Sequence, residues 1–336
     1  MHIIIGNSAD EAWRRVADLL LGSTDALTQP SRGGETRELL HVALEIEDPS
    51  QRWVISRTPP MNPAFALVEA FWIAAGRRDS ALPTYWNPRL RNYCGDGANY
   101  HGAYGYRLRH QLGFDQLDRV YRALLAASDT RQCVLQIWNS AIDMPREDGS
   151  PVDPDIPCNV LAFPKLRNGR LQWLQVIRSS DLFLGVPHNI VQFTVLQEIL
   201  SGWLGVDPGS YVQISDSMHI YTRDLAAIRS SLPVVIPRSS DSYALDRVTW
   251  EKIFPGVMQR LDKLASPVLS TSEFRAVAFS NDAPSAYENA VLTAAADSAR
   301  RRGLKHEIQE CTDRCTNSAL RLLWSRWRTR CEGSSR

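Results

Sequence analysis

Residues 163–179 read FPKLRNGRLQWLQVIRS, and this stretch decides the fold class. Alternating segments flank Asn168-Gly169, a pair that tight hairpin turns prefer, so the stretch predicts two antiparallel strands. The next segment, IVQFTVLQEILSGWL at 190–204, is strongly apolar and predicts a helix buried on most sides. YVQISDSMHIY at 211–221 has the composition of a further strand. Strands and a helix in this succession predict an α+β domain.

Further patterns lie on both sides of this region. They predict, in chain order, a helix over 9–21, a polar loop over 28–37, a helix over 62–75, irregular structure over 79–105, a helix over 113–127, a strand over 134–140 and helices near 248–264 and 283–302. The sequence contains no internal repeat and no linker. We therefore expect one domain over residues 1–336, with a divergent helical region from about 245 to 336.

The composition limits the classes of protein to consider. Lys and Arg number 38 against 37 Asp and Glu, so the formal charge of +1 gives no general attraction for nucleic acid. No apolar run reaches membrane-spanning length, and MHIIIGNSADEAWRR at the start does not resemble a secretion signal. Six cysteines are too few for a disulfide scaffold, and Cys311 and Cys315 lack further ligands at zinc spacing. We expect a cytoplasmic protein with free thiols, no metal and no membrane association.

Two polar stretches beside apolar segments are candidates for a binding site. Cys158, in DPDIPCN, follows a Pro-rich loop and opens a predicted strand, where its thiol can be held and exposed. A lone cysteine in a strand is more often an inert core residue. Residues 178–190, RSSDLFLGVPHNI, crowd Arg, Ser, Asp and Asn around a Gly-Val-Pro turn. Polar groups so close to a buried helix need partners, and a polar ligand is one candidate.

The order of Pro157-Cys158, the hairpin, RSSDLFLGVPHNI and SDSMHIY resembles the folate-dependent thymidylate synthase family. The family pattern is Pro-Cys-His, then Arg-Ser-x-Asp-x-x-x-Gly-x-Pro-x-Asn, then His-x-Tyr. The likeness covers roughly residues 10–225. It implies a mixed β-sheet packed by helices, one face of which forms a homodimer interface. It also implies transfer of a one-carbon unit from 5,10-methylenetetrahydrofolate to a pyrimidine nucleoside monophosphate.

The chemistry of that reaction explains the cysteine. C5 of a pyrimidine is a poor nucleophile, and addition of a thiolate to C6 makes C5 able to attack an electrophilic carbon. Cys158 is therefore the predicted nucleophile, and Arg178 fits the nearby cation that a thiolate needs. The resemblance assigns the nucleotide phosphate to Arg32, Arg178, Ser179 and, from the second subunit of a dimer, Arg131.

The resemblance also assigns residues to proton handling and to the other ligand groups. Glu69 lies on an apolar helix, where burial would raise its pKa, and it is expected to move protons at the O4 and C5 side of the base. The alternative is a structural carboxylate. Tyr104 is expected near C5, whose proton it helps to remove. The remaining ligand contacts are assigned to His219 and Tyr221 for the sugar 3′-hydroxyl, and to Asp181 and Trp86 for the folate. Trp86 taken alone is better explained as a core residue.

Departures from the family pattern concern the product and the base. Asn159 replaces the His that follows the nucleophile and lies near ring position 4, so we expect altered proton handling there. The chain ends in WSRWRTRCEGSSR instead of the apolar segment that closes over the folate, so water can add at C5 and give a 5-hydroxymethyl product. Asn189 corresponds to the residue that reads N3 and O4 of uracil, yet an amide turned by 180° suits cytosine. Because Asn159 changes the network around it, cytidylate (CMP or dCMP) is slightly favoured over dUMP.

Two alternatives stay open. One is an ordinary thymidylate synthase that methylates dUMP and has an unusual tail. The other is a non-catalytic relative that binds nucleotide or RNA, for which Trp324 and Trp327 among the arginines of the tail are the best support. The simpler interpretation of that tail is a solvated basic helix.

Overall fold

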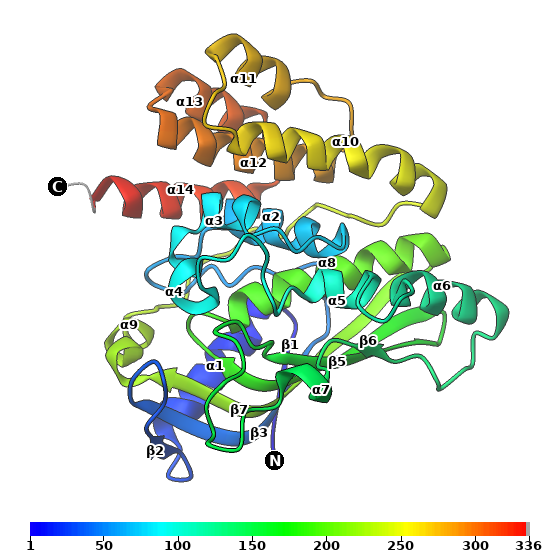
Figure 1. Ribbon diagram of the computed structural model, residues 1–336. Coiled ribbons are helices and arrows are strands. Elements are labelled where there is room, and N and C mark those ends of the chain that lie inside the picture. The colour runs from blue at the N-terminus through cyan, green and yellow to red at the C-terminus, as the bar shows by residue number, and fades with distance from the viewer. Residues whose placement is uncertain (334–336) are drawn as a thin grey trace.

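A mixed sheet of seven strands forms one side of the protein, whose computed structural model describes residues 1–333 (Figure 1). The strands are β1 (His2–Gly6), β2 (Leu27–Gln29), β3 (Thr36–Ile46), β4 (Leu135–Gln136), β5 (Asn159–Arg167), β6 (Arg170–Asp181) and β7 (Asp207–Tyr221). They run in the order β1-β3-β7-β6-β5-β4, with β2 beside β3. β1 and β3 pair in parallel, as do β6 and β7, whereas the other neighbours are antiparallel. The predicted α+β class with a mixed sheet is confirmed.

The predicted turn at Asn168-Gly169 joins β5 to β6. Both residues have positive φ angles, 51° and 70°, as the tight hairpin turn requires, and Asn and Gly adopt such angles at low cost. Antiparallel pairing continues along the hairpin as far as Asn159. The hairpin is therefore confirmed, and Cys158 directly precedes its first strand, β5.

Helix α8 (Val186–Leu204) connects the parallel strands β6 and β7. It is buried on nearly all sides because it contacts the sheet on one side and α2 (Pro63–Ala74) on the other (Figure 1). Apolar residues around the whole helix fit this two-sided burial, which confirms the prediction for 190–204. Asn62 is the N-cap residue of α2, and its side chain accepts hydrogen bonds from the amides of Ala64 and Phe65.

Further helices complete this part of the chain. They are α1 (Ala9–Gly22), α3 (Ala81–Trp86), α4 (Arg91–Cys94), α5 (Tyr104–Arg109), α6 (Gln116–Ala126), α7 (Ser140–Asp143) and α9 (Leu225–Arg229), with 3-10 turns η1 (Pro88–Leu90) and η2 (Thr222–Asp224). The predictions of α1, α2 and α6 are confirmed. The prediction of irregular structure over 79–105 is partly wrong, because helices as short as α3 and α4 complete too few turns to show a periodicity. The strand predicted over 134–140 is reduced to the two residues of β4.

The C-terminal region is helical. Its helices are α10 (Arg247–Ala265), α11 (Thr271–Ala278), α12 (Ser285–Arg302), α13 (Lys305–Arg314) and α14 (Ser318–Gly333). α10 and α12 confirm the helices predicted near 248–264 and 283–302. α12 and α14 pack against α2, so this region lies on the side of α2 away from the sheet (Figure 1). No described helix is long and apolar enough to cross a membrane. The single-domain organisation and the cytoplasmic location stay predictions.

Candidate active site

Cys158 lies at the end of a loop that two arginines hold in place. Arg178 donates from Nε to the Pro157 carbonyl at 2.9 Å and from Nη2 to the Ile156 carbonyl at 3.3 Å. Arg32 donates from Nη1 to the Pro154 carbonyl at 3.1 Å. Both guanidinium groups are thus anchored on the backbone that leads to the thiol, which is half-buried and free of any disulfide. The structure brings these two predicted phosphate ligands to the predicted nucleophile.

The surroundings of Cys158 act on its thiol in opposite directions. Burial raises the pKa of Cys158, and Asp155 and Asp181 raise it further, whereas the positive charges of Arg178 and Arg32 lower it. Burial prevails, so the pKa of the free protein's thiol lies above its ordinary value. Formation of the thiolate therefore depends on the two arginines and on the groups that a ligand brings.

Asn159 is fully buried, and a chain of donors fixes its amide. The indole of Trp173 donates from Nε1 to Gln175 Oε1 at 3.1 Å, and Gln175 Nε2 donates to Asn159 Oδ1 at 3.1 Å. An indole N–H can only donate, so this chain runs in one direction. Nδ2 of Asn159 has no partner within strict hydrogen-bond geometry among the described residues, but it faces the Tyr104 hydroxyl as a donor and lowers the pKa of Tyr104.

Glu69 on α2 is connected to α8 by a second chain of side chains. Gln192 donates from Nε2 to Glu69 Oε2 at 2.6 Å, and Asn189 donates from Nδ2 to Gln192 Oε1 at 3.0 Å. Burial raises the pKa of Glu69 to about 7, although the Gln192 hydrogen bond lowers it. The sequence motifs did not point to Gln192. The signal that could have found it is a polar residue three positions after Asn189, on the same face of an apolar helix.

Tyr104 begins α5, and its ring stacks on Phe193 of α8 with centroids 6.0 Å apart. Burial raises the pKa of Tyr104, the negative charge of a Cys158 thiolate raises it further, and a carboxylate at Glu69 acts in the same direction. These interactions place the phenol among the predicted catalytic residues. With its pKa raised, the hydroxyl is neutral near pH 7 and can donate or accept a hydrogen bond.

The adjacent ends of β6 and β7 carry the other predicted ligand residues. Asp181 pairs with His219 across the two strands, and its Oδ1 accepts hydrogen bonds from the amides of Phe183 and Leu184 at 2.8 and 3.0 Å. Burial raises the pKa of Asp181 above its ordinary value. Those two hydrogen bonds and the charge of His219 lower the pKa, but they do not outweigh burial. Ser179 lies two residues earlier on β6, opposite Ser217 of β7.

Tyr221 brings the Arg32 loop to the same edge of the sheet. A Cβ atom at Gly33 would overlap the Tyr221 hydroxyl, so only glycine allows this close approach. The rings of Tyr221 and His219 meet edge to face with centroids 5.7 Å apart. The segment from Ser31 to Gly34 therefore lies on the residues predicted to bind the sugar.

Two predicted site residues do not join this group in the protomer. Arg131 is exposed and has no hydrogen bond or ion pair among residues 1–333, and its role across a dimer interface stays a prediction. Trp86 is only 1% exposed, and its ring meets Tyr85 edge to face at 4.9 Å. This burial fits the core interpretation of Trp86, and its contact with folate stays a prediction.

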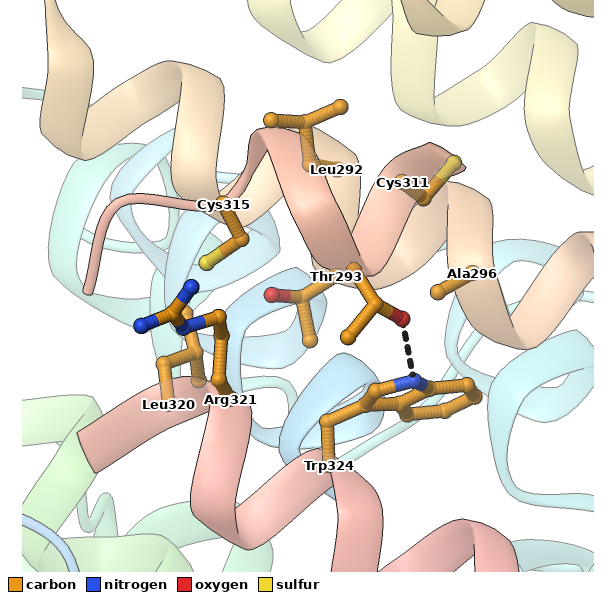
Figure 2. Close-up of a pocket in the computed structure, with 9 residues that line it drawn as sticks. Leu292, Thr293, Ala296, Cys311, Cys315, Leu320, Arg321 and Trp324 are labelled. Atoms are coloured by element: carbon orange, nitrogen blue, oxygen red, sulfur yellow. Dashed lines mark hydrogen bonds between the residues drawn. The ribbon is translucent and has the colours of Figure 1, made fainter. Parts of the chain in front are cut away.

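A small cavity between α12, α13 and α14 contains none of the predicted site residues (Figure 2). Cys311 and Cys315 line it, and Trp324 donates from Nε1 to Thr312 Oγ1 at 3.1 Å. The described residues contain no group of three or more His, Cys, Asp or Glu that could hold a metal ion. Trp324 is 3% exposed, so it does not offer a face for stacking on bases.

The C-terminal basic segment is not the solvated helix that the arginine pattern favoured. Arg326 donates to Thr58 Oγ1 at 3.3 Å, and Arg330 donates to the Pro60 carbonyl at 3.1 Å. Apolar side chains of α14 are buried in the same core. The arginine pattern was misleading because long basic side chains can pack their stems while their ends find carbonyls.

Comparisons with known proteins agree with this arrangement. The family model for thymidylate synthase matches residues 29–248. A deoxyuridylate hydroxymethyltransferase of Bacillus phage SP01 is 33% identical over 238 residues, which cover 68% of this chain and 61% of that protein. Another, from Pseudomonas phage M6, is 32% identical over 203 residues, or 58% and 56% of the two chains. A putative thymidylate synthase of Methanosarcina acetivorans is 25% identical over 231 residues, 66% of this chain and 91% of that protein.

The chain spans about three fifths of the length of these phage relatives. The family match itself covers more than half of the chain and contains the loop, strand ends and helices that carry Cys158, Arg178 and Asn189. The chain therefore belongs to the thymidylate synthase family.

Proposed function

We propose that the protein transfers a one-carbon unit from 5,10-methylenetetrahydrofolate to C5 of a pyrimidine nucleoside 5′-monophosphate, with water completing a 5-hydroxymethyl group. One observation carries the proposal: the free Cys158 thiol lies at a loop that Arg178 and Arg32 hold by backbone hydrogen bonds. The names of the phage relatives, deoxyuridylate hydroxymethyltransferases, support the hydroxymethyl product over methylation.

The reaction begins with addition of the Cys158 thiolate to C6 of the base. The electron pair of the C5–C6 bond moves toward the ring-4 oxygen or nitrogen, and C5 then attacks the methylene carbon of the cosubstrate. Cleavage of the bond from that carbon to the folate nitrogen releases tetrahydrofolate, and loss of the C5 proton leaves an exocyclic methylene. Water adds to the methylene, and the returning electron pair expels the Cys158 thiolate. No hydride moves, so dihydrofolate is not a product.

The phosphate and sugar groups account for the charged residues around the thiol. Arg32 and Arg178 carry guanidinium groups suited to phosphate, and Ser179 adds a hydroxyl. His219 and Tyr221 are proposed to bind the 3′-hydroxyl, and the contact of Gly33 with Tyr221 joins this pair to the Arg32 loop. The phosphate and the sugar thus bind along one edge of the sheet.

Proton handling is proposed for Glu69 and Tyr104. A carboxyl with a pKa of about 7 exchanges protons readily at neutral pH, which suits a group that protonates the ring-4 atom and takes the proton back. Tyr104 is neutral in the same range and is proposed to help in removal of the C5 proton. Glu69 lies on α2 and Tyr104 begins α5, so both belong to the helical layer. Cys158 instead directly precedes β5 of the sheet.

The hydrogen-bond chains support uracil as the base, against the slight preference for cytosine that the sequence suggested. Asn189 donates from Nδ2 to Gln192, so its Nδ2 lies on the side of Asn189 that faces Glu69. Ring position 4 of the base is proposed to bind on this side. A donor there suits O4 of uracil, and Asn189 Oδ1 is left for N3–H. Nδ2 of Asn159, at the position near ring atom 4 in the family, is likewise a donor, and it faces the Tyr104 side chain. We therefore propose dUMP over dCMP or CMP.

Asp181 and the uncovered face of the sheet are proposed to bind the remaining partners. A carboxyl at the end of β6 can accept from the amide and amino groups of a pterin, and the loop amides at 183 and 184 hold it in position. Half-buried alternate residues of β5, β6 and β7 that point away from α8 include the apolar Leu161, Phe163, Leu174, Val176, Val212 and Ile214, with the polar Lys165, Gln172 and Ser210 beside them. This face supports the proposed homodimer, in which Arg131 would reach the partner's phosphate.

Product masses test the proposal. The protein is incubated separately with dUMP, dCMP and CMP in the presence of 5,10-methylenetetrahydrofolate, and the mass of each nucleotide product is measured by mass spectrometry. We expect 5-hydroxymethyl-dUMP with tetrahydrofolate. Methylated dUMP with dihydrofolate would identify a thymidylate synthase instead, and nucleotide binding without any product would favour the non-catalytic alternative.

A further inference from the structure

Gln192 is the side chain that joins the two groups proposed to face the base. It donates to Glu69 Oε2 at 2.6 Å and accepts from Asn189 Nδ2 at 3.0 Å. The side chain is 4% exposed, so water does not compete with either hydrogen bond. Its two polar atoms therefore work together, because an amide that offers its nitrogen on one side must offer its oxygen on the other.

The direction of this chain depends on the carboxyl at its end. An ionised carboxylate only accepts, so Gln192 must turn Nε2 toward it and Oε1 toward Asn189. Asn189 must then turn Nδ2 toward Gln192, which leaves Oδ1 free. If the carboxyl is protonated and donates, Gln192 can reverse, and Asn189 reverses with it. The two directions present opposite donor and acceptor patterns to a ligand.

We infer that Gln192 is a positioning residue for base choice: it relays the hydrogen-bonding state of the Glu69 carboxyl to the Asn189 amide and so selects uracil when that carboxyl accepts. The inference rests on the proposed function, since it concerns which pyrimidine the same site takes. Nδ2 of Asn189 on the Glu69 side matches O4 of uracil, and the reversed amide matches the amino group and N3 of cytosine.

Among the described residues, Glu69 is the one charged group that bonds Gln192 or Asn189. Asp155 acts on Cys94, Tyr100 and Tyr104, and Arg57 acts on His188, without a hydrogen bond to this chain. The titratable groups that interact with Glu69 are Cys94 of α4, Tyr104 of α5 and Tyr100 in the loop between them, and the pKa of each is raised mainly by burial, so all are neutral near pH 7. On α8, burial lowers the pKa of His188 to about 3, so it is neutral as well. The carboxyl is therefore the group whose protonation changes the chain between pH 6 and 8.

Two substitutions separate positioning from mere packing. Gln192→Met keeps the length of the side chain but removes both hydrogen bonds, so the Asn189 amide loses its preferred direction. Gln192→Glu retains an acceptor for Asn189 whichever of the two neighbouring carboxyls carries their shared proton, so the uracil direction is kept. Gln197→Met on the same helix is the matched control, because buried Gln197 bonds only backbone carbonyls of Leu171, Gly209 and Ser210.

The measurement is the ratio of kcat/KM for dUMP to that for dCMP at pH 6 and pH 8, with calorimetric Kd values for both nucleotides. We expect Gln192→Met to lower the ratio about tenfold, the worth of one buried hydrogen bond. Gln192→Glu and Gln197→Met should keep it. In the unsubstituted protein the ratio should fall at pH 6, where Glu69 is protonated, and this dependence on pH should vanish in Gln192→Met.

An unchanged ratio in Gln192→Met, or an equal loss in Gln197→Met, would overturn the inference while the proposed function stands. If the unsubstituted protein converts neither nucleotide, the proposed function fails. The ratio of Kd values then decides on Gln192 alone, because base preference in binding requires no turnover.

Discussion

Replacement of Glu69 by Gln tests both the electrostatics and the chemistry of the site. The carboxyl lies between α2 and α8, and its described hydrogen-bond partner is Gln192. Burial raises its pKa from 4.5 to about 7. The substitution keeps the size of the side chain and can still accept from Gln192, but it removes the ionisable group. Its effect on folding should therefore depend on pH.

The sign of the effect follows from proton binding. Between pH 4.5 and 7 the folded protein holds a proton on Glu69 that the unfolded chain has released, so the stability of the folded state falls as pH rises through that window. A rise in pKa of about 2.5, at about 1.4 kcal/mol per pKa unit, amounts to roughly 3–4 kcal/mol. This stability is fully present below pH 4.5 and is lost above pH 7. The Glu69→Gln variant does not lose this stability, because the Gln amide does not ionise.

Guanidinium denaturation at pH 5 and pH 8, followed by tryptophan fluorescence, measures this difference. The free energy of unfolding of Glu69→Gln, taken relative to that of the unsubstituted protein, should be roughly 2–3 kcal/mol more favourable to the folded state at pH 8 than at pH 5. Glu147→Gln, on an exposed loop, is the matched control and should change little. The same Glu69 variant should lose about 10²–10⁴-fold in kcat if the carboxyl moves protons. Parallel stability curves for the two proteins at both pH values would refute the buried, high-pKa carboxyl.

Three further substitutions test the roles of single residues. Cys158→Ala should abolish release of tritium from C5 of labelled dUMP, while calorimetry still detects nucleotide binding; surviving release would contradict the covalent mechanism. Arg178→Ala removes the proposed phosphate ligand and the hydrogen bond to the Pro157 carbonyl, so the KM for dUMP should rise at least about tenfold and kcat should fall, and unchanged steady-state kinetics would contradict this role. Asn189→Asp should move the kcat/KM ratio toward dCMP by about tenfold or more, whereas a constant ratio would mean that another group reads the base.

The sequence predicted the centre of the fold well because the signals there are local. The Asn168-Gly169 turn needs two positive φ angles, and few residue pairs other than this one adopt them easily. The continuous apolar character of 190–204 reflects burial on two sides, which α8 finds here between the sheet and α2. The order of the motifs then placed Cys158, Arg178 and Asn189 around one edge of the sheet.

Other elements depend on contacts that no local pattern records. β3 pairs with β1, β2 and β7, strands that lie from a few residues to about 180 residues away in the chain. α3 and α4 are single turns or little more, held by neighbours rather than by periodicity. Gln192 escaped notice for a similar reason: its importance comes from Glu69, which lies 123 residues earlier. The burial of Trp324 likewise arises from α13, on which it donates a hydrogen bond.

The two amide chains differ in the group that ends each of them, and this difference bears on how the site reads a base. Trp173 is a permanent donor, so the amide of Asn159 keeps one direction at every pH. The carboxyl of Glu69 can change, so the amide of Asn189 keeps its direction only while that carboxyl accepts. A donor at Asn159 that cannot reverse would oppose the amino group of cytosine even after Asn189 has reversed. We therefore expect Gln175→Leu, which frees Asn159, to raise dCMP turnover at pH 6 more than at pH 8. An equal rise at both pH values would mean that the two amides act independently.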